Sequence, residues 1–384
     1  MNPNYIKQVA DISSMEEASL KVTGHLKGEW IEVSADQEIL NQLKLRGYGF
    51  EEDGSFKLSL VEAAYLAWTD KLELSGIKGR GVDPLLRALS EKKPEDFLKF
   101  LVFQDLRRRG RLVRYEPRTP FLRLYPPGAT IGSKAANVLV FPMSEDELVR
   151  QKEVLRAVLH AGRLRKRLLL AIVGTESDIT YYYAENFMPN KIRDFELDLL
   201  PEAEGILIHD RVVIWDTEVA AKFYMNGFWG HPMGVRKPKP DKEYRRPLQL
   251  SLMEAIYLNK KGVLRIKDSK GRNLSQKEIL DVVRKFRSKA EARIVTYSYW
   301  RDMGYVVKSS AAKYGGHYLI YEKGPGIDHA PYLCVVSYPE ELITPVNLLR
   351  VGRVATSVNK TLVISVVRGS QILNYKMKWE RALR

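Results

Sequence analysis

The C-terminal part of the chain contains a tyrosine, a histidine and a lysine whose functional groups are suited to proton transfer and charge stabilisation. Tyr321 precedes a Gly- and Pro-rich stretch that ends at His329, and Lys360 stands directly before a later apolar run. An imidazole, with an ordinary pKa of about 6.5, exchanges a proton near neutral pH, whereas a lysine amine stays cationic. A loop histidine flanked by Gly, Pro and Asp is more often a solvated surface residue than a catalytic one, and both interpretations stand at this point.

An internal duplication indicates which elements would position these residues. Residues 58–66 read L-S-L-x-E-A-x-Y-L, and the same pattern recurs at 250–258. In both copies a serine stands three residues before a glutamate, which is the spacing of a capping box that satisfies the free amides of a helix start. We therefore expect equivalent helices to begin at Ser59 and Ser251.

Further pairs of features keep nearly the same separation. Gly110 and Gly304 each follow a predicted helix, as a C-cap glycine does, and they lie 194 residues apart. The apolar strands predicted at 166–173 and 360–367 have the same separation. The sequence therefore predicts an α+β protein formed by tandem duplication, with a small α/β N-terminal module and a mixed α/β module with a central β-sheet in each half. The four modules are expected at residues 1–92, 95–187, 195–286 and 288–384, and the halves are expected to join near 187–191.

The second copy contains about twelve additional residues. Its Gly-aromatic element at 226–230 lies 180 residues after the counterpart at 46–49, whereas the helix that follows lies 192 residues after its own counterpart. The extra residues fall in 233–247, a Pro-rich stretch with six lysines and arginines. We interpret this stretch as a solvated basic loop, with contact to RNA as the alternative.

Composition excludes several classes of protein. The chain has 384 residues, with 62 Lys and Arg against 47 Asp and Glu, and its net charge of +15 favours a polyanionic partner or surface. The single cysteine, Cys334, excludes an intramolecular disulfide and a multi-cysteine zinc site, and we expect it to be a buried small apolar residue. Residues 1–7 have no apolar core followed by a cleavage site, and no apolar run is long enough to cross a membrane. We therefore expect a cytoplasmic protein that does not associate with membranes.

The two halves differ at the histidine. In the first half, Tyr125 matches Tyr321 and Lys166 matches Lys360, but the stretch 126–135 contains no histidine. Because duplicated modules share their folding constraints, a difference at equivalent positions is more informative about function than either residue alone. The second half alone supplies the complete set of tyrosine, histidine and lysine.

At these residues the sequence resembles a known family. Residues 321–330 read Y-x-x-G-P-G-I-D-H-A and residues 352–360 read G-R-V-A-x-S-V-x-K, and both patterns resemble the archaeal tRNA-splicing endonucleases. The pattern W-R-D-x-G-Y-x-V-K at 300–308 resembles the helix-to-strand entry of the same family. The resemblance implies the two-repeat homodimeric class, in which the first half is an inactive partner unit fused to a catalytic one. The modules would then be the N-terminal module of the inactive repeat (1–92), a degenerate nuclease-like module (95–187), the N-terminal module of the active repeat (195–286) and the catalytic nuclease module (288–384).

The resemblance also implies a reaction and the residues that perform it. Tyr321, His329 and Lys360 match the family's catalytic triad, which cleaves precursor tRNA at bulge-helix-bulge motifs without a metal or cofactor. The family's reaction leaves a 2′,3′-cyclic phosphate and a 5′-hydroxyl. His329 would protonate the leaving 5′-oxygen, and Lys360 would stabilise the negative charge that develops on the phosphorane. Tyr321 would be the base, a role for which nearby cations must lower its ordinary pKa of about 10.

Two further roles follow from the resemblance. Arg353 matches an arginine that packs against a flipped-out base of the RNA, and a planar guanidinium suits such stacking. A second arginine of the family has no clear counterpart here, and Tyr375 is the candidate to stack in its place. The acidic loop with Glu176 and Asp178 would dock into a basic groove on the catalytic unit of the other chain of a homodimer, although acidic loop residues are commonly just solvated.

Two alternatives remain at the level of the sequence. A catalytically silent RNA-binding module would share the net charge and bind phosphates without cutting. A metal-dependent nuclease is the other alternative, but the chain has no H-E-x-x-H motif or comparably spaced cluster of carboxylates and histidines. The remaining histidines have no spacing typical of metal ligands and are expected to be structural or surface residues; they are His25, His160, His209, His231 and His317.

Overall fold

The computed structural model describes residues 21–75, 82–309 and 312–380, and the segment 1–7, for which no secretory signal is expected, lies outside them. The chain divides into two compact units. Unit 1 comprises residues 1–147, 160–183 and 380–384, and unit 2 comprises residues 148–159 and 184–379. Within the described ranges, no helix has both the length and the apolar character needed to cross a membrane.

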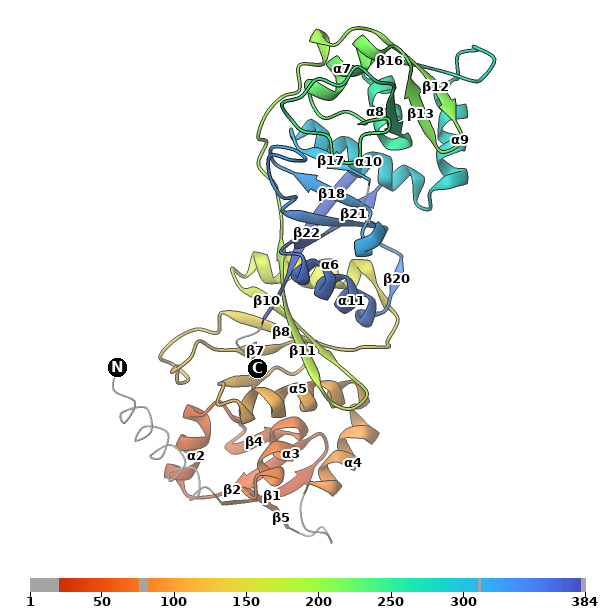
Figure 1. Ribbon diagram of the computed structural model, residues 1–384. Helices are drawn as coiled ribbons and strands as arrows, with labels where there is room; N and C mark the ends of the chain where they lie inside the picture. The colour runs from red at the N-terminus through yellow and green to blue at the C-terminus, as the bar shows by residue number, and fades with distance from the viewer. Residues whose placement is uncertain (1–20, 76–81, 310–311, 381–384) are drawn as a thin grey trace, which may run out of the picture. The chain divides into compact units, whose positions relative to one another are not determined.

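In the residues that the structure describes, the N-terminal module of unit 1 has a small five-stranded sheet and three helices (Figure 1). The strands are β1 (Val22–Lys27), β2 (Trp30–Ser34), β3 (Phe50–Glu52), β4 (Ser55–Ser59) and β5 (Leu72–Leu74), and the helices are α2 (Gln37–Leu45), α3 (Leu60–Trp68) and α4 (Asp83–Lys92). The order across the sheet is β3-β4-β2-β1-β5. Strand β1 is antiparallel to β2 and parallel to β5.

The corresponding module of unit 2 repeats this topology. Its strands are β12 (Ala203–Ile208), β13 (Arg211–Ile214), β14 (His231–Pro232), β15 (Leu248–Ser251) and β16 (Leu264–Lys267), and its helices are α7 (Thr217–Met225), α8 (Leu252–Lys260) and α9 (Gln276–Phe286). The order is β14-β15-β13-β12-β16, and β12 is antiparallel to β13 and parallel to β16. The same neighbours in the same directions confirm the predicted tandem duplication and the α+β class.

The two capping boxes form as predicted. The Ser59 hydroxyl accepts a hydrogen bond from the Glu62 amide at 3.2 Å, and the Glu62 carboxylate accepts one from the Ser59 amide at 3.0 Å. The Ser251 hydroxyl and the Glu254 amide are 3.3 Å apart, and the Glu254 carboxylate accepts from the Ser251 amide at 2.9 Å. Both glutamates are buried, so each helix start is fixed by a carboxylate inside the protein.

The second module of unit 1 places helix α5 (Phe97–Arg108) against a sheet. Its strands are β6 (Val113–Tyr115), β7 (Leu122–Leu124), β8 (Val138–Ser144) and β10 (Arg167–Val173), in the order β10-β8-β7-β6. Strands β8 and β10 are parallel. Four further elements are β9 (Val149–Arg150), α6 (Gln151–Arg163), β11 (Ile179–Asn186) and β20 (Leu342–Ile343).

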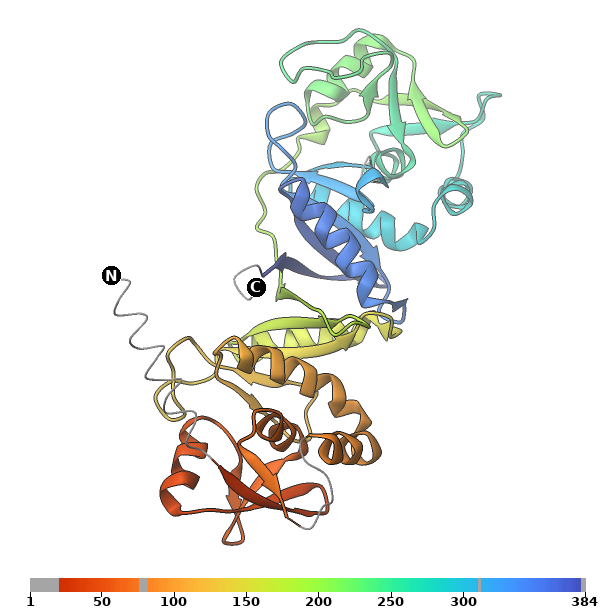
Figure 2. The same cartoon turned by 60° about the horizontal axis from the view of Figure 1, so that its bottom comes forward.

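The second module of unit 2 contains the candidate site. Its strands are β17 (Val306–Lys308), β18 (Tyr318–Tyr321), β19 (Tyr332–Ser337), β21 (Thr361–Arg368) and β22 (Gln371–Trp379), in the order β17-β18-β19-β21-β22. Helices α10 (Ala290–Asp302) and α11 (Pro345–Ser357) pack on this sheet, and Figure 2 shows α11 lying across it. Strands β19 and β21 are parallel, and α11 is the crossover between them. One hydrophobic core runs from the N-terminal module of this unit into the sheet, so the two modules are packed together.

Candidate active site

The backbone of unit 2 brings the ends of three neighbouring strands to one edge of the sheet. Strand β18 ends at Tyr321 and runs antiparallel to β19, which begins at Tyr332. Strand β19 runs parallel to β21, and Tyr332 pairs with Thr361, the first residue of β21. Parallel strands begin at the same edge, and an antiparallel neighbour ends there. Tyr321, His329 just before β19, and Lys360 just before β21 therefore come to the same edge.

Lys360 is tied to the segment that contains the histidine. Its half-buried ammonium donates a hydrogen bond of 2.8 Å to the carbonyl of Ala330, the residue that follows His329. The Thr361 amide donates at 2.8 Å to the carbonyl of Pro331, so the main chains are bonded at this point as well. The cation lies next to the backbone from which the imidazole projects.

Residues 322–330, which we call the histidine loop, are held by a carboxylate of the loop itself. The Asp328 side chain accepts hydrogen bonds from three successive main-chain amides, those of Glu322 at 3.1 Å, Lys323 at 3.0 Å and Gly324 at 2.8 Å. Three amide donors on one carboxylate are a strong constraint on a short loop. The side chain of His329 is exposed at the end of this loop, available to a ligand from solvent.

Tyr321 is half-buried, and its surroundings shift its acidity. Burial raises the pKa of the phenol, and the neighbouring Asp328 carboxylate and the Tyr314 phenol raise it further. In the absence of a ligand the side chain is therefore a neutral phenol at physiological pH. A base requires a lowered pKa, so the shift at Tyr321 is in the opposite direction.

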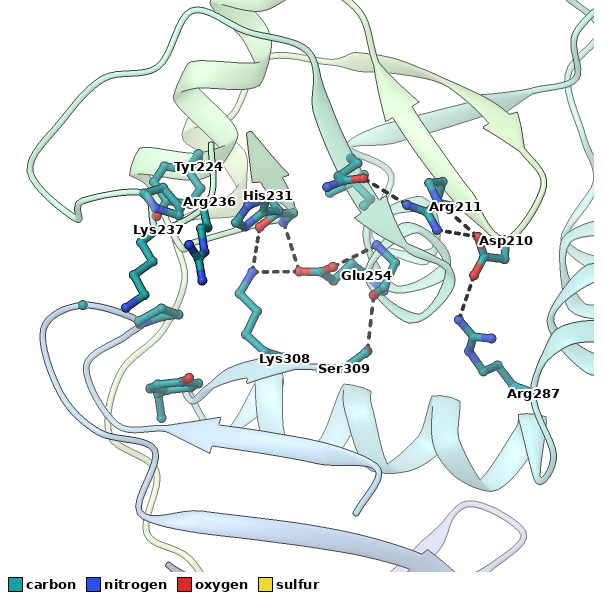
Figure 3. A pocket seen from close by; sticks show the side chains of 18 residues that line it. Asp210, Arg211, Tyr224, His231, Arg236, Lys237, Glu254, Arg287, Lys308 and Ser309 are labelled. Atoms are coloured by element: carbon teal, nitrogen blue, oxygen red, sulfur yellow. Dashed lines mark hydrogen bonds and ion pairs between the residues drawn. The ribbon is translucent and has the colours of Figure 1, made fainter. Parts of the chain in front are cut away.

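A cavity of about 680 Å³ lies beside Tyr321, between the sheet and the N-terminal module of unit 2 (Figure 3). Basic side chains dominate its charged lining; they are Arg211, Arg236, Lys237, Arg287 and Lys308. Two acidic residues, Asp210 and Glu254, also line it. Figure 3 shows Arg236 and Lys237 toward one end of the cavity, with Asp210, Arg211 and Arg287 toward the other.

The acidic residues neutralise part of this charge. Asp210 accepts from Arg211 at 2.9 Å and from Arg287 at 3.2 Å. Burial raises the pKa of Asp210, but these hydrogen bonds outweigh it and hold the pKa below its usual range. Glu254 pairs with Lys308 at 3.1 Å. Burial also raises the pKa of Glu254, and the Lys308 ammonium with the Ser251 hydrogen bonds brings it below its usual value.

The basic loop at 233–247 provides the cations of the cavity that have no such partner. Arg236 and Lys237 are exposed, and neither forms an ion pair or hydrogen bond with the part of the chain that the structure describes. The six basic side chains of this loop are all exposed, as the interpretation of a solvated basic loop predicted. That prediction is incomplete, because residues 236–238 also form one wall of the cavity that reaches Tyr321.

Arg353 lies in the second half of α11 and is exposed. Its guanidinium makes no hydrogen bond or ion pair with the residues that the structure covers. Arg350, one turn earlier, is also exposed and donates to the Asn347 side chain at 3.3 Å. Helix α11 thus presents two solvated guanidinium groups ahead of Lys360.

The suggestion that Tyr375 stacks on RNA is wrong. Its side chain is fully buried in β22, and its phenolic oxygen is 2.6 Å from the Gln151 side-chain amide, which donates to it. A ring with no exposed surface is not accessible to a base. Tyr375 is a core residue.

The acidic loop with Glu176 and Asp178 lies in unit 1, between β10 and β11. Both side chains are exposed, and Ser177 between them has a positive φ of 63°. The Gly174 amide donates to the Asp178 carbonyl at 2.8 Å and closes the turn. A third carboxylate, Glu145, accepts from the main chain of this loop at 3.0 Å, and sequence spacing gave no signal for it.

Asp328 and Lys308 are the residues of unit 2 whose roles the sequence did not reveal. Asp328 stands directly before His329. Its position next to a histidine does not indicate that its carboxylate binds the backbone amides of residues 322–324. Lys308 ends the W-R-D-x-G-Y-x-V-K pattern, and a lysine at a strand end is ordinarily solvated. Its side chain is 17% exposed and pairs with Glu254.

Comparison with protein families gives two matches, each occurring twice in the chain. Residues 22–85 and 203–280 match the tRNA intron endonuclease N-terminal domain. Residues 97–181 and 290–375 match the tRNA intron endonuclease catalytic C-terminal domain.

Curated relatives fall into two sizes. The tRNA-splicing endonuclease of Methanosarcina mazei is 32% identical over 354 residues, which cover 90% of this chain and 95% of the relative. The protein of the same name from Hyperthermus butylicus is 35% identical over 179 residues, which cover 46% of this chain and 98% of the relative. The tRNA-splicing endonuclease of Saccharolobus islandicus is 37% identical over 178 residues, 46% of this chain.

Proposed function

The chain belongs to the tRNA intron endonuclease family, and from this premise we propose that it excises introns from precursor tRNA. In this proposal it cuts at bulge-helix-bulge sites, with no metal or cofactor, by attack of a ribose 2′-hydroxyl on the adjacent phosphate. The bond from phosphorus to the 5′-oxygen breaks. The products therefore end in a 2′,3′-cyclic phosphate and a 5′-hydroxyl.

The observation that supports this function most is the meeting of three strand ends in unit 2. The ends of β18, β19 and β21 lie at one edge of the sheet, and Lys360 bonds to the carbonyl beside His329. Transesterification of this kind needs a proton acceptor at the 2′-oxygen, a donor at the 5′-oxygen and a cation for the phosphorane. Groups from three adjacent strands are suited to surround a single phosphate.

Each side chain has a distinct part in the proposal. His329 is exposed and sits on a loop fixed by Asp328, so its imidazole is suited to protonate the leaving 5′-oxygen. Lys360 supplies a positive charge to the phosphorane, where more negative charge develops than in the ground state.

Tyr321 contacts the attacking 2′-hydroxyl in the proposal. Since burial and Asp328 raise the pKa of this phenol, it accepts a proton only if a cationic side chain lies against it in the complex with the substrate. Its first contribution is then to orient the nucleophile. A Tyr321→Phe variant removes the hydroxyl and keeps the ring, so its cleavage rate measures the contribution of the hydroxyl.

Arg353 contacts the RNA in the proposal. It is exposed on α11, the helix that leads to Lys360. A free guanidinium plane near a cleavage site is suited to stack on a base that has left the helix, which is how proteins recognise bulged nucleotides. Tyr375, being buried, has no part in this contact.

We propose that the active form is a homodimer in which the acidic loop of one chain docks on the catalytic unit of the other. The cavity beside Tyr321 is the candidate acceptor, because Arg236 and Lys237 lack partners among the described residues and carry the charge opposite to Glu176 and Asp178. In this arrangement modules 1–92 and 95–187 form the inactive repeat, and modules 195–286 and 288–384 form the active one.

The decisive experiment is cleavage of an intron-containing precursor tRNA in the presence of a metal chelator. The proposal expects cut products whose 3′ ends resist a phosphatase until acid opens the cyclic phosphate. The alternative of a silent RNA-binding protein expects retention of intact RNA. Cleavage that appears only after magnesium is added would instead support a metal-dependent nuclease. The His25→Ala variant, altered in the first repeat, is the control for any His329 variant.

A further inference from the structure

The histidine loop packs against an aromatic ring of the neighbouring module. Phe228 lies in the turn between α7 and β14 and is 8% exposed. A Cβ atom at position 324 would stand 2.4 Å from Cε2 and 2.7 Å from Cδ2 of this ring, so the contact leaves room for glycine alone. Gly324 also has a φ of 147°, which L side chains rarely adopt.

Phe228 itself has an unusual backbone conformation. Its φ is 55°, in the left-handed region where a non-glycine residue is strained. Such a residue persists because the structure around it determines it, and strained residues concentrate at functional sites. The question is what the aromatic ring at this position provides.

The first repeat shows the same turn with glycine. Trp229 stacks on Tyr257 with centroids 5.6 Å apart, as Tyr48 stacks on Tyr65 at 6.3 Å. The position before Trp229 is Phe228, and the position before Tyr48 is Gly47, which has a φ of 77°.

Hydrogen bonds support this equivalence. The Gly230 amide donates to Glu254 at 3.0 Å, and the Gly49 amide donates to Glu62 at 3.1 Å. The fold therefore accommodates glycine at this position, and the repeat that contains His329 has phenylalanine there instead.

A lysine fixes the strained turn in the second repeat. The Lys308 ammonium donates to the carbonyl of Phe228, to that of Gly230 at 2.8 Å and to Glu254 at 3.1 Å. In the described part of the first repeat, no lysine or arginine hydrogen-bonds to the equivalent Glu62; its donors are Ser59 and Gly49. The equivalent turn of the first repeat is bound by an arginine, since Arg107 donates to the carbonyls of Arg46 at 2.8 Å and Gly47 at 3.3 Å. Particular to the active repeat are the phenylalanine in the turn and a lysine that binds both the turn and the buried glutamate.

We propose that Phe228 is a positioning residue, whose ring fixes the histidine loop so that the His329 imidazole meets the scissile phosphate. The contact acts at Gly324, and Asp328 binds the Gly324 amide at 2.8 Å, which carries the constraint to the residue before the histidine. Arg193 supports the same loop by donating to the Lys323 carbonyl at 3.2 Å. The inference rests on the proposed function in one respect only, namely that His329 is catalytic.

The test uses two readouts on the full-length protein. Phe228→Gly removes the ring and relieves the left-handed strain, whereas Phe228→Tyr keeps the ring. The chain has six histidines, so ring-carbon-labelled histidine gives a sparse NMR spectrum in which His329→Ala assigns the signal. The second readout is single-turnover cleavage of precursor tRNA at saturating protein, with the RNA dissociation constant measured separately.

We expect Phe228→Gly to shift or broaden the His329 signal and to slow cleavage roughly tenfold to hundredfold, because small displacements of a reacting group are costly. The dissociation constant stays within about twofold, and Phe228→Tyr behaves as the parent protein. Phe286→Gly is the matched control, since it removes a half-buried ring of the same module that packs on His209 at 4.6 Å. It leaves the His329 signal unchanged.

Gly324→Ala approaches the same contact from the loop and is the second variant if Phe228→Gly does not fold. It should disturb the His329 signal in the same way. An unperturbed His329 signal with parent-like cleavage in either folded variant, or an equal perturbation by Phe286→Gly, overturns the inference. If His329→Ala cleaves normally, the proposed catalytic role fails instead, and the NMR comparison still decides whether Phe228 fixes the loop.

Discussion

Lys360 donates a hydrogen bond of 2.8 Å to the carbonyl oxygen of Ala330. In the first repeat, Lys166 donates in the same way to the carbonyl of Ala136, 194 residues earlier. The lysine–carbonyl bond is therefore a feature of the module in both copies, and it does not by itself indicate catalysis. What differs is the neighbouring residue, because His329 has no counterpart in the first repeat.

This pair of equivalent lysines gives a matched test of charge stabilisation. Lys360→Met should lower single-turnover cleavage by about 10²–10³, the effect of removing one group that stabilises transition-state charge. Lys166→Met loses the same structural bond in the inactive copy and should cleave as the parent protein does. Equal losses of activity in the two variants would assign Lys360 to structure alone.

The two capping glutamates, whose pKa values are shifted in opposite directions, should respond differently to substitution. Burial raises the pKa of Glu62, and hydrogen bonds from Ser59 and Gly49 only partly offset it. Glu254 has a lowered pKa because of Lys308 and Ser251. Glu254→Gln should therefore destabilise unit 2 by about 3 kcal/mol at neutral pH, since it leaves a buried ammonium without its partner. Glu62→Gln should have a much smaller effect or a stabilising one, and thermal unfolding measures both.

The pH dependence of stability follows from the directions of these two pKa shifts. The stabilisation from Glu254 is present above the ordinary glutamate pKa and is lost as the pH falls through the lowered pKa of the folded state. For Glu62 the sign is reversed, because a raised pKa favours folding at low pH and that advantage disappears as the pH rises to the folded-state pKa. Unfolding curves of Glu254→Gln and the parent protein should thus converge on acidification. Curves that stay equally separated down to pH 3 would contradict the pairing with Lys308.

Arg353 should matter for bulged RNA more than for continuous helices. Arg353→Ala should weaken binding to a bulge-containing substrate by about 1–3 kcal/mol, the value of a stacked base, and change binding to a plain duplex much less. Arg350→Ala removes the same charge one turn earlier on α11 and is the control. Equal losses for both RNAs with Arg353→Ala would indicate a phosphate contact.

The docking of the acidic loop predicts a salt-sensitive dimer. Replacing Glu176 and Asp178 together with lysine should shift the protein to the monomer in light scattering, whereas Glu38→Lys, at an exposed site on α2, should not. Replacing Arg236 and Lys237 with glutamate should have the same effect. Mixing the two reversed proteins should restore assembly, because opposite charges again face each other. A dimer that survives both reversals at low salt would rule out this contact.

Local patterns in the sequence were enough to locate the helix starts and the duplication. A capping box depends on residues three apart, so spacing alone predicted the bonds at Ser59 and Ser251, and these are confirmed. The residue-by-residue equivalence of the Gly-aromatic turns in the two repeats was harder to predict. Their glycines suggested an offset of 180, whereas the stacking of Trp229 on Tyr257 shows that Phe228 takes the position of Gly47.

Contacts between segments distant in sequence account for what was missed. The buried hydroxyl of Tyr375 accepts a hydrogen bond from Gln151, more than two hundred residues earlier, and a strand pattern gives no sign of that partner. The approach of Phe228 to Gly324 joins two modules, and no periodicity encodes it. The candidate catalytic residues at the strand ends were identified through the resemblance to a family. That they lie at one edge of the sheet depends on the order of the strands, which spacing along the chain does not specify.

The most direct test of the central claim is cleavage of a precursor tRNA in which sulfur replaces the 5′-oxygen at the scissile bond. A thiolate leaves without protonation, so a missing general acid no longer matters. His329→Ala should lose at least about 100-fold in single-turnover rate on the all-oxygen substrate and recover close to the parent rate on the sulfur substrate, whereas Lys360→Met should stay slow on both. Cleavage of the all-oxygen RNA by His329→Ala at the parent rate would contradict the account.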